Sequence, residues 1–129
     1  MTNQKEQDAK KMNDSSIKQG DIYICDLGYC VGSEQRGERP CLVVSNDILN
    51  ITSSTVVVIP ITSKAKKILP THFILTQDKY PFLFYNDNTL LCECIRSVST
   101  IRLHKHIGAI HQKDLQSILG VLSNVYTIK

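Results

Sequence analysis

Short apolar runs separated by polar stretches fill most of this chain, and this pattern limits the fold more than any other feature. The runs are rich in β-branched and aromatic residues and too short for helices, which favours strands. The predicted strands are Ile22–Leu27, Cys41–Ser45, Thr55–Ile61, His72–Leu75, Leu90–Ile95, Ser97–Ile101 and Lys105–Ile110.

A single apolar stripe of helical period closes the chain. Its members are Leu115, Ile118, Leu119, Leu122, Val125 and Tyr126. Asp114 precedes them in the expected first turn, where a carboxylate stabilises a helix by interacting with the positive end of its dipole. Many short strands followed by one amphipathic helix predict a mainly β fold, a small closed or nearly closed β-barrel whose open side the helix plugs.

The 129 residues, of which 42% are hydrophobic, suffice for one compact core. Residues 1–16 are almost wholly polar and predict a disordered tail, so the folded domain is expected at 17–129. The segment Gly28–Pro40 is polar and glycine-rich, which predicts a long surface loop. Asn46 and Asp47 predict a turn or short helix, and Pro60 predicts an edge or the end of a strand.

Net charge and targeting signals exclude few functions. Fifteen Lys and Arg against twelve Asp and Glu leave a net charge of +3, which permits a polyanionic partner without requiring one. The sequence has neither the run of about eighteen apolar residues that a membrane span needs nor the apolar core of a signal peptide. We expect a cytoplasmic protein with no membrane association.

The five cysteines predict reduced thiols, because an odd number without a secretion signal argues against a disulfide framework. Cys92 and Cys94 would share one face of the predicted strand with Leu90 and act as small core side chains. Zinc is the alternative, with His104, His106 and His111 as further ligands. Since no pair has the spacing of familiar zinc sites, we predict no metal.

A family resemblance becomes specific once the motifs are read in order. They are Gly20–Tyr23, Asp26–Leu27, Val31–Pro40, Leu42–Asp47, Val58–Ser63, Leu69–His72 and Leu91–Ser97. Together they resemble the MazF/PemK toxins over roughly residues 18 to 128. The resemblance implies an SH3-like barrel of the MazF/CcdB type and a homodimer. It also implies an acidic antitoxin of the MazE/PemI kind as partner.

The same resemblance implies an enzyme without cofactors. It would cleave single-stranded RNA at short sequence motifs by attack of the ribose 2′-hydroxyl on the adjacent phosphate, leaving 2′,3′-cyclic phosphate and 5′-hydroxyl ends. Arg39, immediately before the proline, matches a principal catalytic arginine, and a guanidinium suits phosphate oxygens. Thr62 matches the family's catalytic threonine, whose hydroxyl would stabilise the developing charge.

Proton abstraction is less determined by the motifs, because a charged arginine is a poor base. Some family members carry an Arg-x-Asp pair on the strand that here reads Leu91-Cys92-Glu93, and the arginine of that pair is missing. Glu93 stands where the acid of the pair would be. It is either the general base or a carboxylate paired with Arg96 or Arg39 for structural reasons.

RNA contacts are implied for six positions that match the family: Ser33, Glu34, Gln35, Leu69, His72 and Lys64. Lys64 with Lys66 and Lys67 forms either a phosphate track or a solvated basic loop. His72 either contacts RNA or is a hydrogen-bonded surface histidine.

Two other functional classes stay open. One is a toxin of the same barrel that poisons DNA gyrase through aromatic-rich helix ends, which the terminus Tyr126–Lys129 does not resemble. The other is a catalytically silent RNA- or peptide-binding module. The recognised RNA motif does not follow from the sequence.

Overall fold

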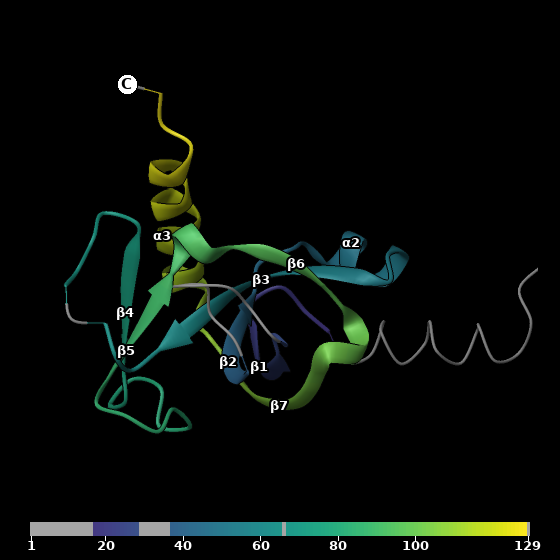
Figure 1. Cartoon of the computed structure of the whole chain (residues 1–129), viewed down its shortest axis with the longest axis horizontal. Coiled ribbons are helices and arrows are strands. Elements are labelled where there is room, and N and C mark those ends of the chain that lie inside the picture. The colour runs from purple at the N-terminus through teal and green to yellow at the C-terminus, as the bar shows by residue number, and fades with distance from the viewer. Residues whose placement is uncertain (1–16, 29–36, 66, 129) are drawn as a thin grey trace, which may run out of the picture.

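The computed structural model describes residues 17–28, 37–65 and 67–128, and it confirms a mainly β chain with a C-terminal helix (Figure 1). The predicted tail, residues 1–16, lies outside the described residues. The strands are β1 (Asp21–Asp26), β2 (Glu38–Val43), β3 (Thr55–Thr62), β4 (His72–Thr76), β5 (Asp87–Leu91), β6 (Arg96–Ser99) and β7 (Leu103–Ala109). The helices are α2 (Asp47–Thr52) and α3 (Gln112–Leu122), with 3₁₀ turns η1 (Cys92–Cys94), η2 (Thr100–Arg102) and η3 (Ser123–Val125).

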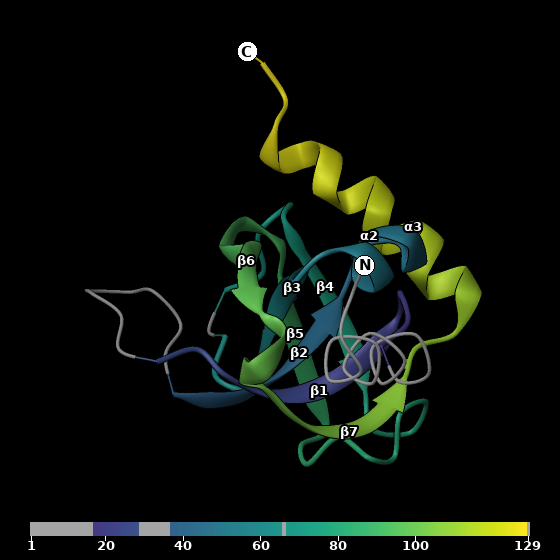
Figure 2. The same cartoon turned by 90° about the vertical axis from the view of Figure 1, so that its right-hand side faces the viewer.

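The strands pair antiparallel in the order β4-β5-β3-β2-β1-β7, and β6 pairs with the first half of β3. They curve strongly, and α3 lies across one side (Figure 2). Their buried side chains form two clusters: one under α3, which includes Ile22, Leu42 and Ile59, and one on the opposite face of these strands, which includes Tyr23, Cys41 and Val58. Within the described residues β4 and β7 end this ladder without pairing with each other. The sheet is therefore open, so of the two predicted alternatives, a closed and a nearly closed barrel, the closed one is wrong.

β3 is the central strand, although Pro60 predicted an edge or a strand end. Its residues 55–58 pair with β6 and residues 61–62 pair with β5, while its other side pairs with β2. Pro60 falls in the gap between the stretches that β6 and β5 occupy. The missing N–H therefore breaks neither of those ladders.

Two strands have other bounds than the sequence predicted: β5 begins at Asp87 instead of Leu90, and β5 and β6 both end earlier than expected. β5 ends at Leu91, opposite His72, and the chain then turns through η1 because Cys92 N–H donates to the carbonyl of Thr71 at 3.0 Å. Cys92 and Cys94 accordingly do not share a strand face: Cys92 is buried and Cys94 half-buried. β6 ends at Ser99, and the expected strand to residue 101 continues instead as η2.

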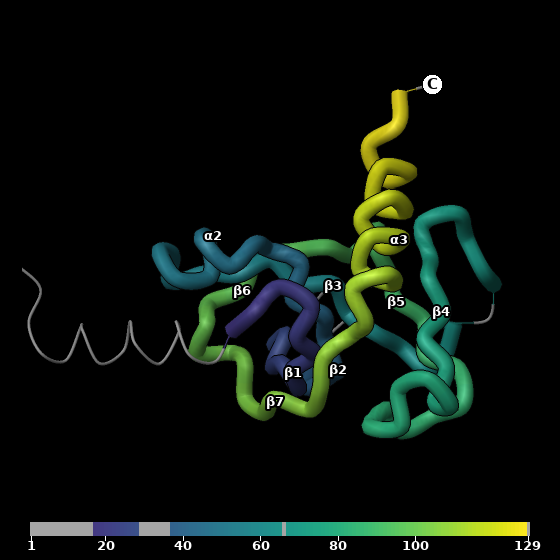
Figure 3. The backbone as a smooth tube through the Cα atoms, turned by 180° about the vertical axis from the view of Figure 1, so that it is seen from behind, coloured from purple at the N-terminus to yellow at the C-terminus, as the bar shows by residue number. Residues whose placement is uncertain are grey.

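α3 covers the core through Leu115 and Ile118, which are buried, while Leu122 and Val125 pack against them in part. Burying such a side chain contributes about 1.5–3 kcal/mol. Two members of the predicted stripe are exposed: Leu119, which lies within α3, and Tyr126, which follows η3. Seen from behind, α3 rises beside β4, which it contacts together with η1 (Figure 3). No helix in the described ranges is long and apolar enough to cross a bilayer.

Candidate active site

A cavity of about 340 Å³ opens where β2, β3 and β4 meet η1. Residues from four separate segments line it: Arg39, Thr62, Lys64, Ala65, Lys67, His72, Leu91 and Glu93. The three side chains that the sequence nominated for catalysis, Arg39, Thr62 and Glu93, therefore face one space. Three cationic side chains on its wall suit a phosphate group.

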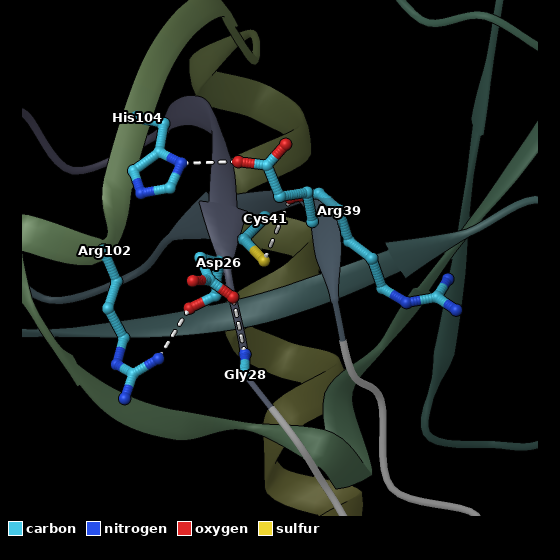
Figure 4. A network of polar contacts seen from close by, with 7 residues as sticks. Asp26, Gly28, Arg39, Cys41, Arg102 and His104 are labelled. Carbon is cyan, nitrogen blue, oxygen red and sulfur yellow. Dashed lines mark hydrogen bonds and ion pairs between the residues drawn. The ribbon is translucent and has the colours of Figure 1, made fainter.

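Arg39 lies within β2 and not in a loop, because this strand begins at Glu38 and pairs with β1 through Arg39 opposite Cys25. Side chains alternate along a strand, so Glu38 and Arg39 point to opposite faces. Glu38 contacts Nδ1 of His104 on β7, whereas Arg39 extends away from His104 and Arg102 (Figure 4). The regular ladder thus directs the guanidinium toward the cavity.

Thr62 is the last residue of β3 and pairs with Thr89 of β5. Only 7% of it is exposed. Its hydroxyl oxygen accepts the backbone N–H of Lys64 at 3.2 Å, which leaves the hydroxyl proton to be donated to another acceptor. At a strand end inside a cavity that also holds Arg39, this proton is available to a phosphate oxygen.

Glu93 is held by two side chains from the segment that leads into β4. Its Oε1 accepts the hydroxyl of Thr71 at 2.9 Å, and its Oε2 lies 3.0 Å from Nε2 of His72. Burial would raise the pKa of Glu93, but hydrogen bonds from His72, its own backbone N–H and Thr71 outweigh burial and lower that pKa. The carboxylate is therefore ionised at neutral pH.

His72 is fixed on both ring nitrogens. Nδ1 accepts the backbone N–H of Leu69 at 3.1 Å, so a neutral ring carries its proton on Nε2 and donates it to Glu93. The side chain is only 5% exposed, which does not fit the surface histidine considered from the sequence. Leu69 was predicted to contact RNA. Among the described residues it does not line the cavity, and its backbone N–H donates to His72.

The stem of the long loop is anchored next to β1 and β2. Gly28 and Gly37 adopt positive φ values of 71° and 72°, which favour glycine, and Gly37 N–H donates to the carbonyl of Gly28 at 3.0 Å. Asp26 accepts Gly28 N–H at 2.8 Å, and Arg102 donates to the Asp26 carbonyl at 3.2 Å (Figure 4). Ser33, Glu34 and Gln35 lie outside the described residues.

The remaining candidate metal ligands have other roles. His104 and His106 lie on β7, where they contact Glu38 and Asp21, and His111 packs on Tyr80. Burial raises the pKa of the Cys92 thiol to about 11, so this sulfur is neutral at pH 7. Within the described ranges, no three His, Cys, Asp or Glu side chains form a group that could hold a metal ion.

Thr71 and the lining residues Ala65 and Leu91 were not singled out from the sequence. Thr71 lies in one of the quoted motifs, but its partner Glu93 is 22 positions away. Only the pairing of β4 with β5, which places His72 opposite Leu91, brings the two together. No local signal in the sequence reveals such a contact.

The sequence is similar to one family of known proteins and to individual proteins named as endoribonucleases. Residues 18–126 match the family described as PemK-like, MazF-like toxin of type II toxin-antitoxin system. Over 103 residues the chain is 44% identical to Endoribonuclease EndoA of Bacillus subtilis, covering 79% of this chain and 87% of that protein. Over 117 residues it is 34% identical to Endoribonuclease MazF of Staphylococcus saprophyticus, covering 88% and 96%.

Among solved structures, the chain resembles an endoribonuclease in complex with its cognate antitoxin from a mycobacterial species. The TM-score is 0.71 at 22% identity, and the match covers 88% of this chain and 98% of that one. This likeness confirms the predicted fold class.

Proposed function

This chain belongs to the PemK-like, MazF-like toxin family of type II toxin-antitoxin systems, and from this membership we propose how it acts on RNA. It is an endoribonuclease toxin, as its relatives from Bacillus and Staphylococcus are named. The proposed reaction is metal-independent cleavage of single-stranded RNA at short sequence motifs, in the cytoplasm. The observation that carries this proposal is the convergence of Arg39, Thr62 and Glu93 on one cavity.

In the proposed reaction the ribose 2′-oxygen attacks the adjacent phosphorus while the bond from phosphorus to the 5′-oxygen breaks. The 2′-hydroxyl proton goes to Glu93, the only carboxylate among the described residues that line the cavity. The leaving oxygen takes up a proton from solvent and becomes the 5′-hydroxyl, and the other product is a 2′,3′-cyclic phosphate. Three of the four lone-pair positions of Glu93 are used, by Thr71, His72 and its own backbone N–H, so one acceptor position remains.

Charge stabilisation falls to Arg39 and Thr62. The phosphorane intermediate carries negative charge on its equatorial oxygens, and the guanidinium fork of Arg39 matches two of them. The Thr62 hydroxyl donates a further hydrogen bond. Lys64 and Lys67 line the same wall and hold the neighbouring phosphates, so side-chain cations supply the positive charge that a metal ion supplies in other nucleases.

The proposed substrate contacts include the predicted residues Ser33, Glu34 and Gln35, together with Leu69 and His72. His72 would act mainly by holding Glu93, since both of its ring nitrogens are engaged. We further propose a homodimer whose cationic groove binds an acidic antitoxin in competition with RNA. Membership of a toxin-antitoxin family supports that partner.

A cleavage assay in EDTA tests this function directly. We expect the purified protein to convert a labelled single-stranded RNA into discrete products with 2′,3′-cyclic phosphate ends, at the same rate with and without the chelator. Intact RNA that stays bound would identify a silent binding module. Unchanged RNA together with inhibited DNA gyrase would identify the non-enzymatic toxin class.

Thr62→Val keeps the shape of the side chain and removes its hydroxyl. Because one hydrogen-bond donor to a developing oxyanion is worth roughly a hundredfold in kcat, we expect a loss of that order with little change in KM. Single-turnover kinetics on a mapped cleavage site measure it. Thr52→Val, an exposed threonine on α2, is the control. A Thr62→Val enzyme as fast as wild type would remove this hydroxyl from the reaction.

A further inference from the structure

Next to the catalytic cavity lies a second cavity of about 230 Å³, on the other side of Arg39 and Lys64. Those two residues line both spaces, so a phosphate held between them places its neighbouring nucleotide at the entrance to the second one. We propose that this second cavity is a nucleobase-binding subsite formed by Phe84, Tyr85 and Asn88. The proposal rests on the function proposed above and names a further part of its substrate site.

Phe84 and Tyr85 form the aromatic wall of this cavity, and both are exposed. Phe84 is 71% and Tyr85 58% exposed, and the two are adjacent in the loop between β4 and β5 (Figure 1). The carboxylate of Glu38 also lines this cavity, and it contacts His104. Large apolar side chains exposed side by side next to two cations suit a ligand with a flat apolar face and a negative charge. A nucleotide has both, because bases stack on aromatic rings while their phosphates bind arginine and lysine.

The loop holds this wall in a fixed position. Tyr80 and Leu83, just before the two rings, are buried, and the Tyr80 hydroxyl donates to Asp114 at the start of α3. Gln77 donates its side-chain amide to the carbonyl of Leu83 at 2.8 Å and its backbone N–H to Asn86 at 3.0 Å. A platform ordered before binding loses less conformational entropy when a base stacks on it.

Asn88 supplies the polar element of the subsite. It is only 3% exposed, and its amide nitrogen donates to the carbonyls of Tyr85 at 2.7 Å and Leu75 at 3.4 Å. In the described part of the chain its amide oxygen accepts no hydrogen bond, although Asn88 lines the cavity. A buried acceptor without a donor is costly, and the N–H of a base edge would satisfy it.

Binding can be tested apart from cleavage with 2′-O-methyl oligonucleotides, which lack the attacking hydroxyl. The chain contains no tryptophan, so Tyr85→Trp introduces a single indole on the aromatic wall. We expect a 2′-O-methyl oligoadenylate to quench its fluorescence and an abasic oligomer of equal length not to. Replacing adenine by N6,N6-dimethyladenine, which has no N6–H, should weaken binding roughly fivefold. Tyr126→Trp, at the exposed chain end, is the control and should not respond.

Cleavage kinetics provide a second test of the subsite. Because stacking on an aromatic ring is worth about 1–3 kcal/mol per base, the double variant Phe84→Ala/Tyr85→Ala should raise KM roughly tenfold or more. Its kcat should change little, and Tyr126→Ala should match wild type. Both replaced side chains are exposed, so folding should survive, as thermal unfolding would verify.

The outcomes separate the two proposals. Cleavage by wild type with an unchanged KM in the double variant overturns the subsite alone. If the same variant also loses suppression by the antitoxin, the aromatic wall serves a protein partner and the subsite is wrong. Absence of cleavage by wild type overturns the proposed function, while quenching by the 2′-O-methyl oligomer still decides for or against the base site.

Discussion

Arg39→Ala is expected to lower kcat for RNA cleavage by about ten-thousandfold, since arginines that neutralise a phosphoryl transition state are worth ~10³–10⁵. The guanidinium approaches the cavity from a regular strand, which fixes its position before substrate binds. A positioned donor of this kind stabilises the charge of the phosphorane more than that of the bound phosphate. Single-turnover cleavage of a mapped site gives the rate of the chemical step.

Arg39→Lys separates charge from geometry. Lysine keeps the positive charge but lacks the planar fork that binds two oxygens, so it should restore only part of the lost rate. Lys105→Ala removes an exposed cation on β7 and should leave the rate at the wild-type value. An Arg39→Ala enzyme with full kcat and only a raised KM would show that this residue binds RNA without taking part in the reaction.

Much of the fold could be predicted from the strand pattern. Alternation of apolar and polar residues and runs of β-branched residues reflect which face of a strand is buried. The prediction from this pattern fails where the pairing between strands sets the position or the end of a strand. Pro60 indicated an edge, yet it lies in a central strand at the gap between two partners, which no local pattern reveals. The run after Leu91 has strand-forming residues, but β4 begins opposite Leu91, and the chain turns once no partner remains beside it.

The sequence predicted only those residues of the candidate site that lie in motifs of the family. Arg39 and Thr62 stood out through the resemblance, and the fold brings them to one cavity. The second cavity was missed, because the stretch around Phe84 and Tyr85 is rich in turn residues and has no periodic pattern. Its shape depends on Tyr80 reaching Asp114, a contact across 34 positions. Such long-range contacts follow from packing rather than from local propensity.

Glu93→Gln is expected to lower kcat about a thousandfold, within the range that general-base catalysis supplies. Glutamine has nearly the same shape and can still accept the hydrogen bond of His72 through its amide oxygen. It cannot take up the 2′-hydroxyl proton. The loss should therefore appear in kcat, whereas a residue that only holds His72 in place would change mainly KM.

The pH dependence gives the sharper test of Glu93 as the base. The hydrogen bonds from His72, the Glu93 backbone N–H and Thr71, which outweigh the effect of burial, hold the pKa of Glu93 below its usual range. The ionised form is the active one, so the wild-type rate should fall only as pH drops through this lowered pKa, below the usual range of a glutamate. In Glu93→Gln that acid limb should vanish, while Asp78→Asn, an exposed carboxylate, should retain it. If Glu93→Gln keeps the acid limb, another group titrates there and accepts the proton, since an amide cannot ionise in this range.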